Sequence, residues 1–187
     1  MTLQEMKKKV LAMIEELNPL SDLLTDDPDI AAKINEVTNQ VMFELSRYKK
    51  LPKYVEMPVV QDQIVEFSDI EEASGYEVYQ IDRVKGVRYD PKANGTVLKM
   101  KESGTAEIDF FAYPERIDAT AKDKAYEFEL SNDVLEVMPY GIAGDLLKSD
   151  ISADYGNVYS VRFREMLERL DHRYQLPAYV IEGGVEV

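Results

Sequence analysis

The spacing of apolar residues changes twice along this 187-residue chain, and each change marks a different kind of secondary structure. Up to residue 48, apolar side chains recur every three or four positions, as on one face of a helix. From residue 51 to about 130 the period becomes two, as in strands, and helical spacing returns after residue 131. This order predicts an α+β fold: a helical body of about four helices with an inserted antiparallel β region and an extended C-terminal tail.

Local signals divide the chain into three parts. Apolar spacing predicts a first helix over residues 2–17, and a second helix begins where Asp27 can act as N-cap and Pro28 can take the first helical position. Pro52 ends it, because proline disfavours helical geometry in the residue before it. We therefore predict a helical body formed by residues 1–50 and 131–175, a β insertion over 51–130, and a tail over 176–187.

The β insertion is predicted from six short runs rich in Val, Ile, Tyr and Phe, separated by turn sequences such as DPKANG and KESG. The tail, LPAYVIEGGVEV, is also apolar and β-prone but has no partner strand nearby in the sequence. It could add a strand to the inserted sheet or to the sheet of a neighbouring chain. The six runs span residues 65–70, 76–84, 86–90, 95–101, 106–114 and 126–131.

Acidic residues outnumber basic ones, which limits the partners of the chain. The 36 Asp and Glu against 22 Lys and Arg give a formal net charge of -14, so the average surface repels phosphate backbones and anionic lipid. General nucleic-acid binding is therefore disfavoured, although a surface past which DNA slides should also repel DNA. No segment reaches about 18 consecutive apolar residues and no signal peptide is recognised, so we expect no membrane association and a cytoplasmic location.

The amino-acid composition excludes several kinds of catalytic site. The chain has no cysteine and a single histidine, His172, which excludes thiolate metal sites, cysteine nucleophiles and multi-histidine zinc sites. A serine or threonine nucleophile needs a base held by a third group, and no G-x-S-x-G motif occurs. His172 falls at the end of the last predicted helix, where a cation suits the negative end of the dipole. We predict no catalytic residue and no cofactor.

The stretch PYGIAGDLLKSDISADYGN, residues 139–157, is the strongest candidate for a ligand site. A phosphate loop requires glycines directly after a strand, but Gly141 and Gly144 lie within helical spacing, and Asp145 would repel phosphate. We interpret Gly141, Ala143 and Gly144 instead as a smooth helix surface for close packing against another helix.

The second half of that stretch resembles the start of a calcium loop. Asp150, Ser152 and Asp154 alternate as oxygen donors, but Tyr155 and Val161 occupy the positions that require glycine and glutamate. An aspartate-rich connection between helices is the simpler interpretation, and adventitious cation binding at Asp150 and Asp154 stays open.

Three further carboxylates, Asp26, Asp27 and Asp29, precede or begin the second predicted helix. They could serve a magnesium-dependent hydrolase if other carboxylates converged on them. They also suit a helix N-terminus, where they cap the backbone and meet the positive end of the dipole. We favour the capping role and predict no metal site.

The chain contains twelve tyrosines, many of them in the predicted β region. Exposed tyrosines on a sheet can stack on sugars, but tyrosine also fills small sheets and protein interfaces. A monomeric β-rich binding module on a helical frame, for a carbohydrate or protein ligand, is therefore the alternative function. Its candidate residues include Tyr76, Tyr79, Tyr89, Tyr113 and Tyr126.

The order of these parts resembles the head-tail adaptor (connector or neck) proteins of tailed bacteriophages, in which a helical body carries an inserted β region. The segment ELSNDVLEVMPYGIAGDLLKSD, followed by GNVYSVRFREMLERLD, matches the family's pattern. That pattern is an acidic cap, an apolar helix with small residues, and a Ser-Asp or Asp-Asp corner. The matching elements here are Asp133, residues 135–147 and Ser149-Asp150.

The resemblance implies a virion structural protein rather than an enzyme. Its subunits would form a homo-oligomeric ring, commonly of twelve, that docks under the portal protein and lines the DNA channel to the tail or other neck proteins. An acidic wall would let DNA pass without specific binding. The implied location is the neck of the virion, and the host cytoplasm during assembly. The implied partner interface comprises Gly141, Ala143, Gly144, Leu176, Pro177, Ala178, Tyr179, Val180 and Ile181.

Overall fold

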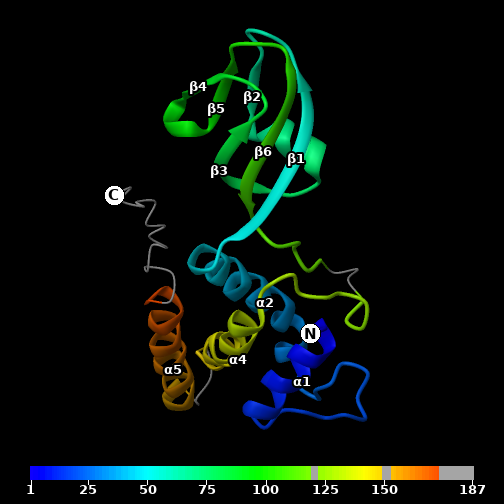
Figure 1. The fold of residues 1–187 in the computed structure, drawn as a ribbon. Helices are drawn as coiled ribbons and strands as arrows, with labels where there is room; N and C mark the ends of the chain where they lie inside the picture. Colours follow the sequence, from blue (N-terminus) through cyan, green and yellow to red (C-terminus); the bar gives the residue numbers. More distant parts are fainter. Residues whose placement is uncertain (119–121, 149–152, 173–187) are drawn as a thin grey trace, which may run out of the picture.

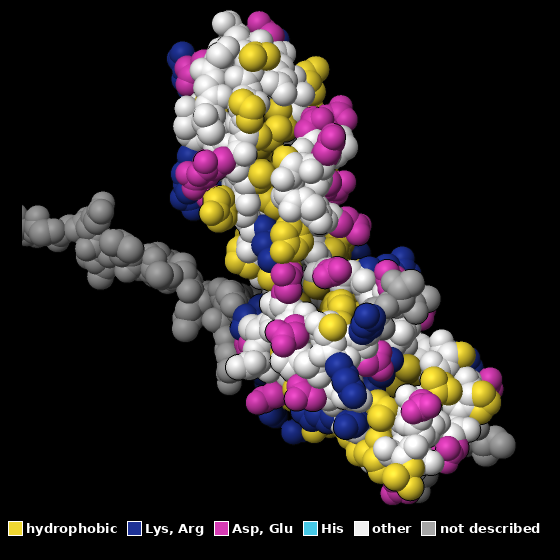
Figure 2. All heavy atoms as spheres, turned by 90° about the vertical axis from the view of Figure 1, so that its right-hand side faces the viewer, with side chains coloured by type: hydrophobic (Ala, Val, Ile, Leu, Met, Phe, Trp, Pro, Cys, Tyr) yellow, Lys and Arg dark blue, Asp and Glu magenta, His cyan; other side chains and the backbone are white. Residues whose placement is uncertain are grey.

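The predicted α+β fold is confirmed by a computed structural model, which describes residues 1–118, 122–148 and 153–172. The described residues form five α-helices and two three-stranded antiparallel sheets. They make an elongated molecule of two lobes, with the strands above most of the helices in Figure 1. Figure 2 shows the narrower junction between the lobes, with acidic and basic side chains interspersed over the visible face.

The helical lobe is built from both ends of the chain: α1 (Leu3–Met13), α2 (Pro28–Tyr48), α4 (Asn132–Leu147) and α5 (Ala153–His172). Helix α4 is buried on nearly all sides, because α1, α2 and α5 all contact it. An apolar helix of this kind is stable only when other elements surround it. The core around it includes Leu3, Met6, Val10, Met42, Leu45, Val134, Met138, Ile142, Phe163 and Leu167.

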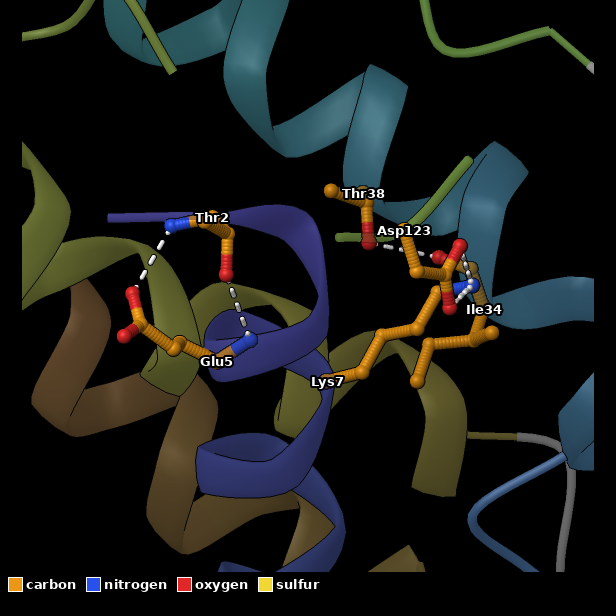
Figure 3. Close-up of polar contacts among 6 residues, drawn as sticks. All are labelled: Thr2, Glu5, Lys7, Ile34, Thr38 and Asp123. Atoms are coloured by element: carbon orange, nitrogen blue, oxygen red, sulfur yellow. Dashed lines mark hydrogen bonds and ion pairs between the residues drawn. The ribbon is translucent and has the colours of Figure 1, made fainter. Parts of the chain in front are cut away.

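Local hydrogen bonds set the limits of α1. The Thr2 hydroxyl accepts from the Glu5 backbone nitrogen at 3.2 Å, and the Glu5 carboxylate accepts from the Thr2 nitrogen at 2.8 Å (Figure 3). The helix ends at Met13 rather than at the predicted residue 17. Glu15 has a φ of 62°, which lies outside helical geometry. Ile14 and Leu17 still pack on the core, from the loop, which explains why their spacing looked helical.

The β lobe is inserted between α2 and α4 and has its own core. One sheet has the order β1-β6-β3, formed by β1 (Leu51–Val59), β6 (Gly104–Ala112) and β3 (Val78–Lys85). The other has the order β2-β5-β4, formed by β2 (Ile64–Glu66), β5 (Val97–Met100) and β4 (Tyr89–Lys92), with the short helix η1 (Ala93–Gly95) between β4 and β5. Alternate residues of β5 and β6 are buried, as the period of two predicts. The core includes Val59, Val65, Ile70, Leu98, Met100, Ile108 and Phe110.

The prediction of a strand over residues 65–70 is wrong in its second half, where helix α3 (Phe67–Ser74) begins. Glu66 and Asp69 form a capping box, and the Glu66 nitrogen donates to Asp69 at 2.8 Å. The helix ends at Gly75, whose φ of 77° favours glycine. A polar capping signal therefore decides the structure here, over the apolar spacing.

Strand β1 begins at residue 51, where the β insertion is predicted to begin, although none of the six predicted runs covers it. It pairs with β6 along its whole length despite Pro52 and Pro58, because it is an edge strand, where a sheet tolerates proline. The two prolines also remove donors that an added strand would need. Strand β3, at the other edge, has two register shifts. This sheet is therefore a poor template for addition of the tail as a further strand.

The predicted β insertion extends to residue 130, but the last strand ends at Ala112, and the chain then returns to the helical lobe. Ile117 exchanges two hydrogen bonds with the Asn39 side chain of α2, at 2.8 and 2.9 Å. Lys7 of α1 is buried and donates to both carboxylate oxygens of Asp123, at 2.8 and 2.9 Å (Figure 3). These contacts hold the returning segment against α1 and α2.

The predicted strand over residues 126–131 is also wrong. Its pairing is limited to a single bridge between Glu127 and Thr2. The apolar residues that suggested a strand are instead buried against helices. Three buried residues of this returning segment join the helical core: Ile117, Phe128 and Leu130.

Candidate functional site

A cleft of about 640 Å³ lies where the two lobes join. The chain passes between the lobes twice here, from α2 into β1 and from β6 back towards α4. The cleft lies between these connections. Apolar and basic side chains line most of it, together with the acidic side chain of Glu129. The principal lining residues are Arg47, Lys49, Lys50, Leu51, Phe111 and Leu130.

Four aromatic rings connect the lobes beside this cleft. Phe43 of α2 meets Tyr113 edge-on, with 5.6 Å between ring centroids. Tyr79 of β3 lies 5.0 Å from Tyr113 and 6.3 Å from Phe111 of β6. Aromatic pairs at such distances contribute about 0.5–1.5 kcal/mol each beyond their buried area. We infer that the rings help to fix the angle between the lobes.

Two ion pairs reinforce the junction. Lys49, just after α2, pairs with Asp133 in the first turn of α4. Lys53 of β1 lies 3.1 Å from Glu129 and 3.0 Å from the Tyr76 hydroxyl. Each pair joins residues more than 70 positions apart in the sequence, so neither was visible as a local pattern.

The ionisable groups of these pairs are stabilised in their charged forms. Partial burial raises the pKa of Asp133, but the hydrogen bond from Lys49, further hydrogen bonds and the positive charge of Lys49 together outweigh it and leave the pKa below its ordinary value of 3.8. Partial burial likewise lowers the pKa of Lys53, but hydrogen bonds to Tyr76 and Glu129 outweigh it and leave the pKa above its ordinary value. Asp133 and Lys53 are therefore charged at neutral pH.

Replacing Asp133 with asparagine should lower the free energy of unfolding by about 1 kcal/mol at pH 7, because Lys49 loses its charged partner. The folded-state pKa of Asp133 is depressed, so its contribution is present above the unfolded value and is lost as pH falls through the folded value. The difference in free energy of unfolding between Asp133→Asn and wild type should therefore shrink below about pH 4. Urea unfolding at several pH values measures it. Glu136→Gln, at an exposed position of α4, is the matched control and should show no such pH-dependent loss.

Two cations at the cleft bind neutral groups. Arg47 donates to the Tyr113 hydroxyl at 3.4 Å. Lys50 donates to the side-chain oxygen of Gln80 at 3.1 Å and lies 4.3 Å from the centroid of the Phe111 ring. Within the described residues, neither forms an ion pair with a carboxylate. In a chain with a net charge of -14, two cations at one cleft with no ion-pair partner among the described residues are a local excess of positive charge.

The prediction of a partner interface at Gly141, Ala143 and Gly144 is wrong, because all three residues are buried inside the chain. A Cβ atom on Gly141 would lie 2.8 Å from both Phe163 of α5 and Val41 of α2. The small residues do allow close helix packing, as their spacing predicts. The packing, however, is internal to the helical body and leaves them inaccessible to another subunit.

The acidic residues before α2 serve as a cap, as predicted. The Asp27 carboxylate accepts from the backbone nitrogens of Asp29 and Ile30, at 2.8 and 3.2 Å, and Pro28 begins the helix. Asp26 accepts from the Asn18 amide at 2.8 Å. In the described ranges, no group of three or more acidic or histidine side chains is arranged to hold a metal ion.

Other predicted positions fall partly or wholly outside the described ranges. Asp150 and Ser152 of the possible calcium loop lie there, and Asp154 is exposed in the first turn of α5. The remaining predicted partner residues also lie outside them: Leu176, Pro177, Ala178, Tyr179, Val180 and Ile181.

The five tyrosines proposed for sugar binding are half-buried and do not form an open platform. Tyr79 and Tyr113 pack on each other at the junction, and the Tyr76 hydroxyl binds Lys53 and Glu129. Burial raises the pKa of Tyr126 to about 12, and this ring packs edge-on against Phe128. Tyr89 packs on the core of the β lobe.

Helix α5 exposes two apolar side chains to solvent. Val158 and Val161 are 65 % and 52 % exposed, and their spacing of three places them on one face. Arg162 and Glu165 form an ion pair of 3.1 Å along the same helix. None of the helices in the described ranges is long and apolar enough to cross a membrane.

In comparisons with known proteins, no protein-family model and no curated protein matched the chain.

Proposed function

We propose that this protein is a subunit of the head-tail adaptor ring of a tailed bacteriophage, docked under the portal and lining the DNA channel to the tail. The observation that carries the proposal is the architecture. Four helices from the two ends of the chain form one body, and the β lobe is inserted between the second and third of them. This is the arrangement that the resemblance to the adaptor family implies.

The exposed face of α5 supports the proposal because it suits a contact between subunits. Burying Val158 and Val161 against a neighbour would remove apolar surface from water, at about 25 cal/mol per Å². The charged side chains beside them would fix the register of the contact. In a ring, one surface of each subunit meets a different surface of the next, so this face needs a second, complementary patch on the neighbour.

The net charge supports the same role. A wall built from many copies of a chain with a charge of -14 would repel the DNA backbone and keep it from adhering during passage. The role is structural, in the neck of the virion, and assembly would take place in the host cytoplasm.

Replacing Val158 and Val161 together with glutamate should abolish the ring without unfolding the subunit. Two buried carboxylates would oppose the contact, whereas both positions are exposed in the subunit, so its free energy of unfolding should change by less than about 0.5 kcal/mol. Native mass spectrometry of wild type and variant measures the assembly, and thermal unfolding checks the fold.

The matched control places the same two charges on the other lobe, at Val60 and Ile64, which are 62 % and 58 % exposed. This variant should assemble as wild type does if α5 forms the contact. Wild-type chain that stays monomeric at all concentrations, alone and with portal protein, would contradict the proposed function.

A further inference from the structure

The cleft between the lobes has the features of a peptide-binding site. Leu51 and Phe111 provide apolar surface, and Arg47 and Lys50 place two cations at its edge. Both cations are exposed, and their partners are a neutral hydroxyl and a neutral amide. Glu129 also lines the cleft, but its carboxylate is paired with Lys53 at 3.1 Å. The chemistry that fits this surface is therefore an apolar segment carrying negative charge.

The described chain ends next to this cleft. Arg169 and Leu170, in the last two turns of α5, share a hollow of about 180 Å³ with Asp133 at the start of α4. Asp133 pairs with Lys49, which lines the cleft. The Lys49–Asp133 ion pair therefore lies between the last turn of α5 and the cleft.

The sequence that follows α5 has the required composition. Residues 176–187, LPAYVIEGGVEV, contain apolar residues, two acidic residues and no lysine or arginine. Three residues, 173–175, connect them to α5, and each extended residue spans about 3.3 Å. The acidic positions are Glu182 and Glu186.

We propose that the cleft binds residues 176–187 of the same chain, with the acidic side chains facing Arg47 and Lys50. A short connection gives the segment an effective concentration in the millimolar range, so modest affinity is enough for occupancy. The proposal does not depend on ring formation. A segment held at the junction would also form part of the surface that a neighbouring subunit meets, so the two proposals are compatible.

Photo-crosslinking of the full-length chain tests this proposal. Tyr179 is replaced with p-benzoyl-L-phenylalanine, and the products are mapped by mass spectrometry. The expected crosslinks join position 179 to peptides containing residues 47–52 or 129–131, within one chain. The double variant Arg47→Glu/Lys50→Glu should reduce their yield at least about fivefold, and adding Glu182→Lys/Glu186→Lys should restore it, because the charges are exchanged.

The matched control is Arg83→Glu/Lys92→Glu, which reverses one arginine and one lysine at exposed positions outside the cleft and should leave the yield unchanged. Circular dichroism verifies that each variant folds. A mixture of ¹⁴N- and ¹⁵N-labelled chains separates crosslinks within a chain from those between chains. Crosslinks that form between chains alone, that map outside the cleft, or that are insensitive to Arg47→Glu/Lys50→Glu would overturn the proposal. Ring formation on the portal is measured separately, so a failure of this proposal is distinguishable from a failure of the proposed function.

Discussion

Replacing Gly144 with leucine is expected to lower the free energy of unfolding of the helical body by about 2–3 kcal/mol. A Cβ atom at this position would lie 2.6 Å from the Ser160 hydroxyl and 3.1 Å from the Ser160 backbone nitrogen. The side chain can turn away, but the backbone of α5 has to move. The loss exceeds the gain of about 1 kcal/mol from removing a glycine inside a helix. Chemical denaturation followed by circular dichroism measures it.

The same leucine at Asn157, an exposed position of α5, provides the control and should change stability by less than about 0.5 kcal/mol. This pair of variants also distinguishes the two interpretations of the glycines. If Gly144 met another subunit, the leucine variant would be as stable as wild type as a monomer and defective in assembly alone. That result would contradict the internal packing of α4 on α5.

Replacing Phe110 with alanine should destabilise the β lobe by about 3–5 kcal/mol, the largest effect expected of a single substitution here. Phe110 is 1 % exposed and lies on the central strand of its sheet, so its removal leaves a cavity among residues of both sheets. Hydrogen exchange should show a loss of protection in β1, β3 and β6. Protection in α4, whose buried residues belong to a different core, should fall less.

Phe111→Ala is the matched control, since it removes the same ring from the next position of the strand. Phe111 lies on the opposite face, at the cleft, and is half-buried. Phe111→Ala should therefore lower the free energy of unfolding by less than Phe110→Ala does. Equal losses at the two positions would show that the alternation of buried and exposed residues on β6 does not hold in solution.

Much of the fold could be predicted because its signals are local. The capping aspartate, Asp27, and the following Pro28 mark the start of α2 from adjacent positions. The alternating residues of β5 and β6 identify strands without knowledge of their partners. The same local signals predict the order of the helical and β parts, and hence the α+β class.

The errors arose where distant contacts decide the structure. Residues 126–131 alternate as a strand does, but Phe128 and Leu130 are buried by helices from the other end of the chain. Pro52 follows the end of α2, as predicted, but its place inside an edge strand cannot be read from one segment. The spacing of apolar residues alone therefore does not show which element covers an apolar face.

The candidate site was largely beyond sequence reasoning for the same reason. The cleft unites the end of α2, the start of β1, β6 and the residues before α4. Its ion pairs, such as Lys49 with Asp133, join residues 84 positions apart. A usable signal was present in SRYKKLPKY, where four cations gather in an acidic chain, but the contacts of Arg47 and Lys50 became visible with the fold.

The most direct test of the proposed adaptor role is electron microscopy of the purified chain mixed with portal rings of the phage to which the proposal assigns it. The proposal predicts negative-stain class averages in which a closed ring of this chain, with a fixed number of subunits, is seated on one end of each portal ring. The proposal would be contradicted by class averages that show bare portal rings and monomeric chain, with the chain in large excess over the portal.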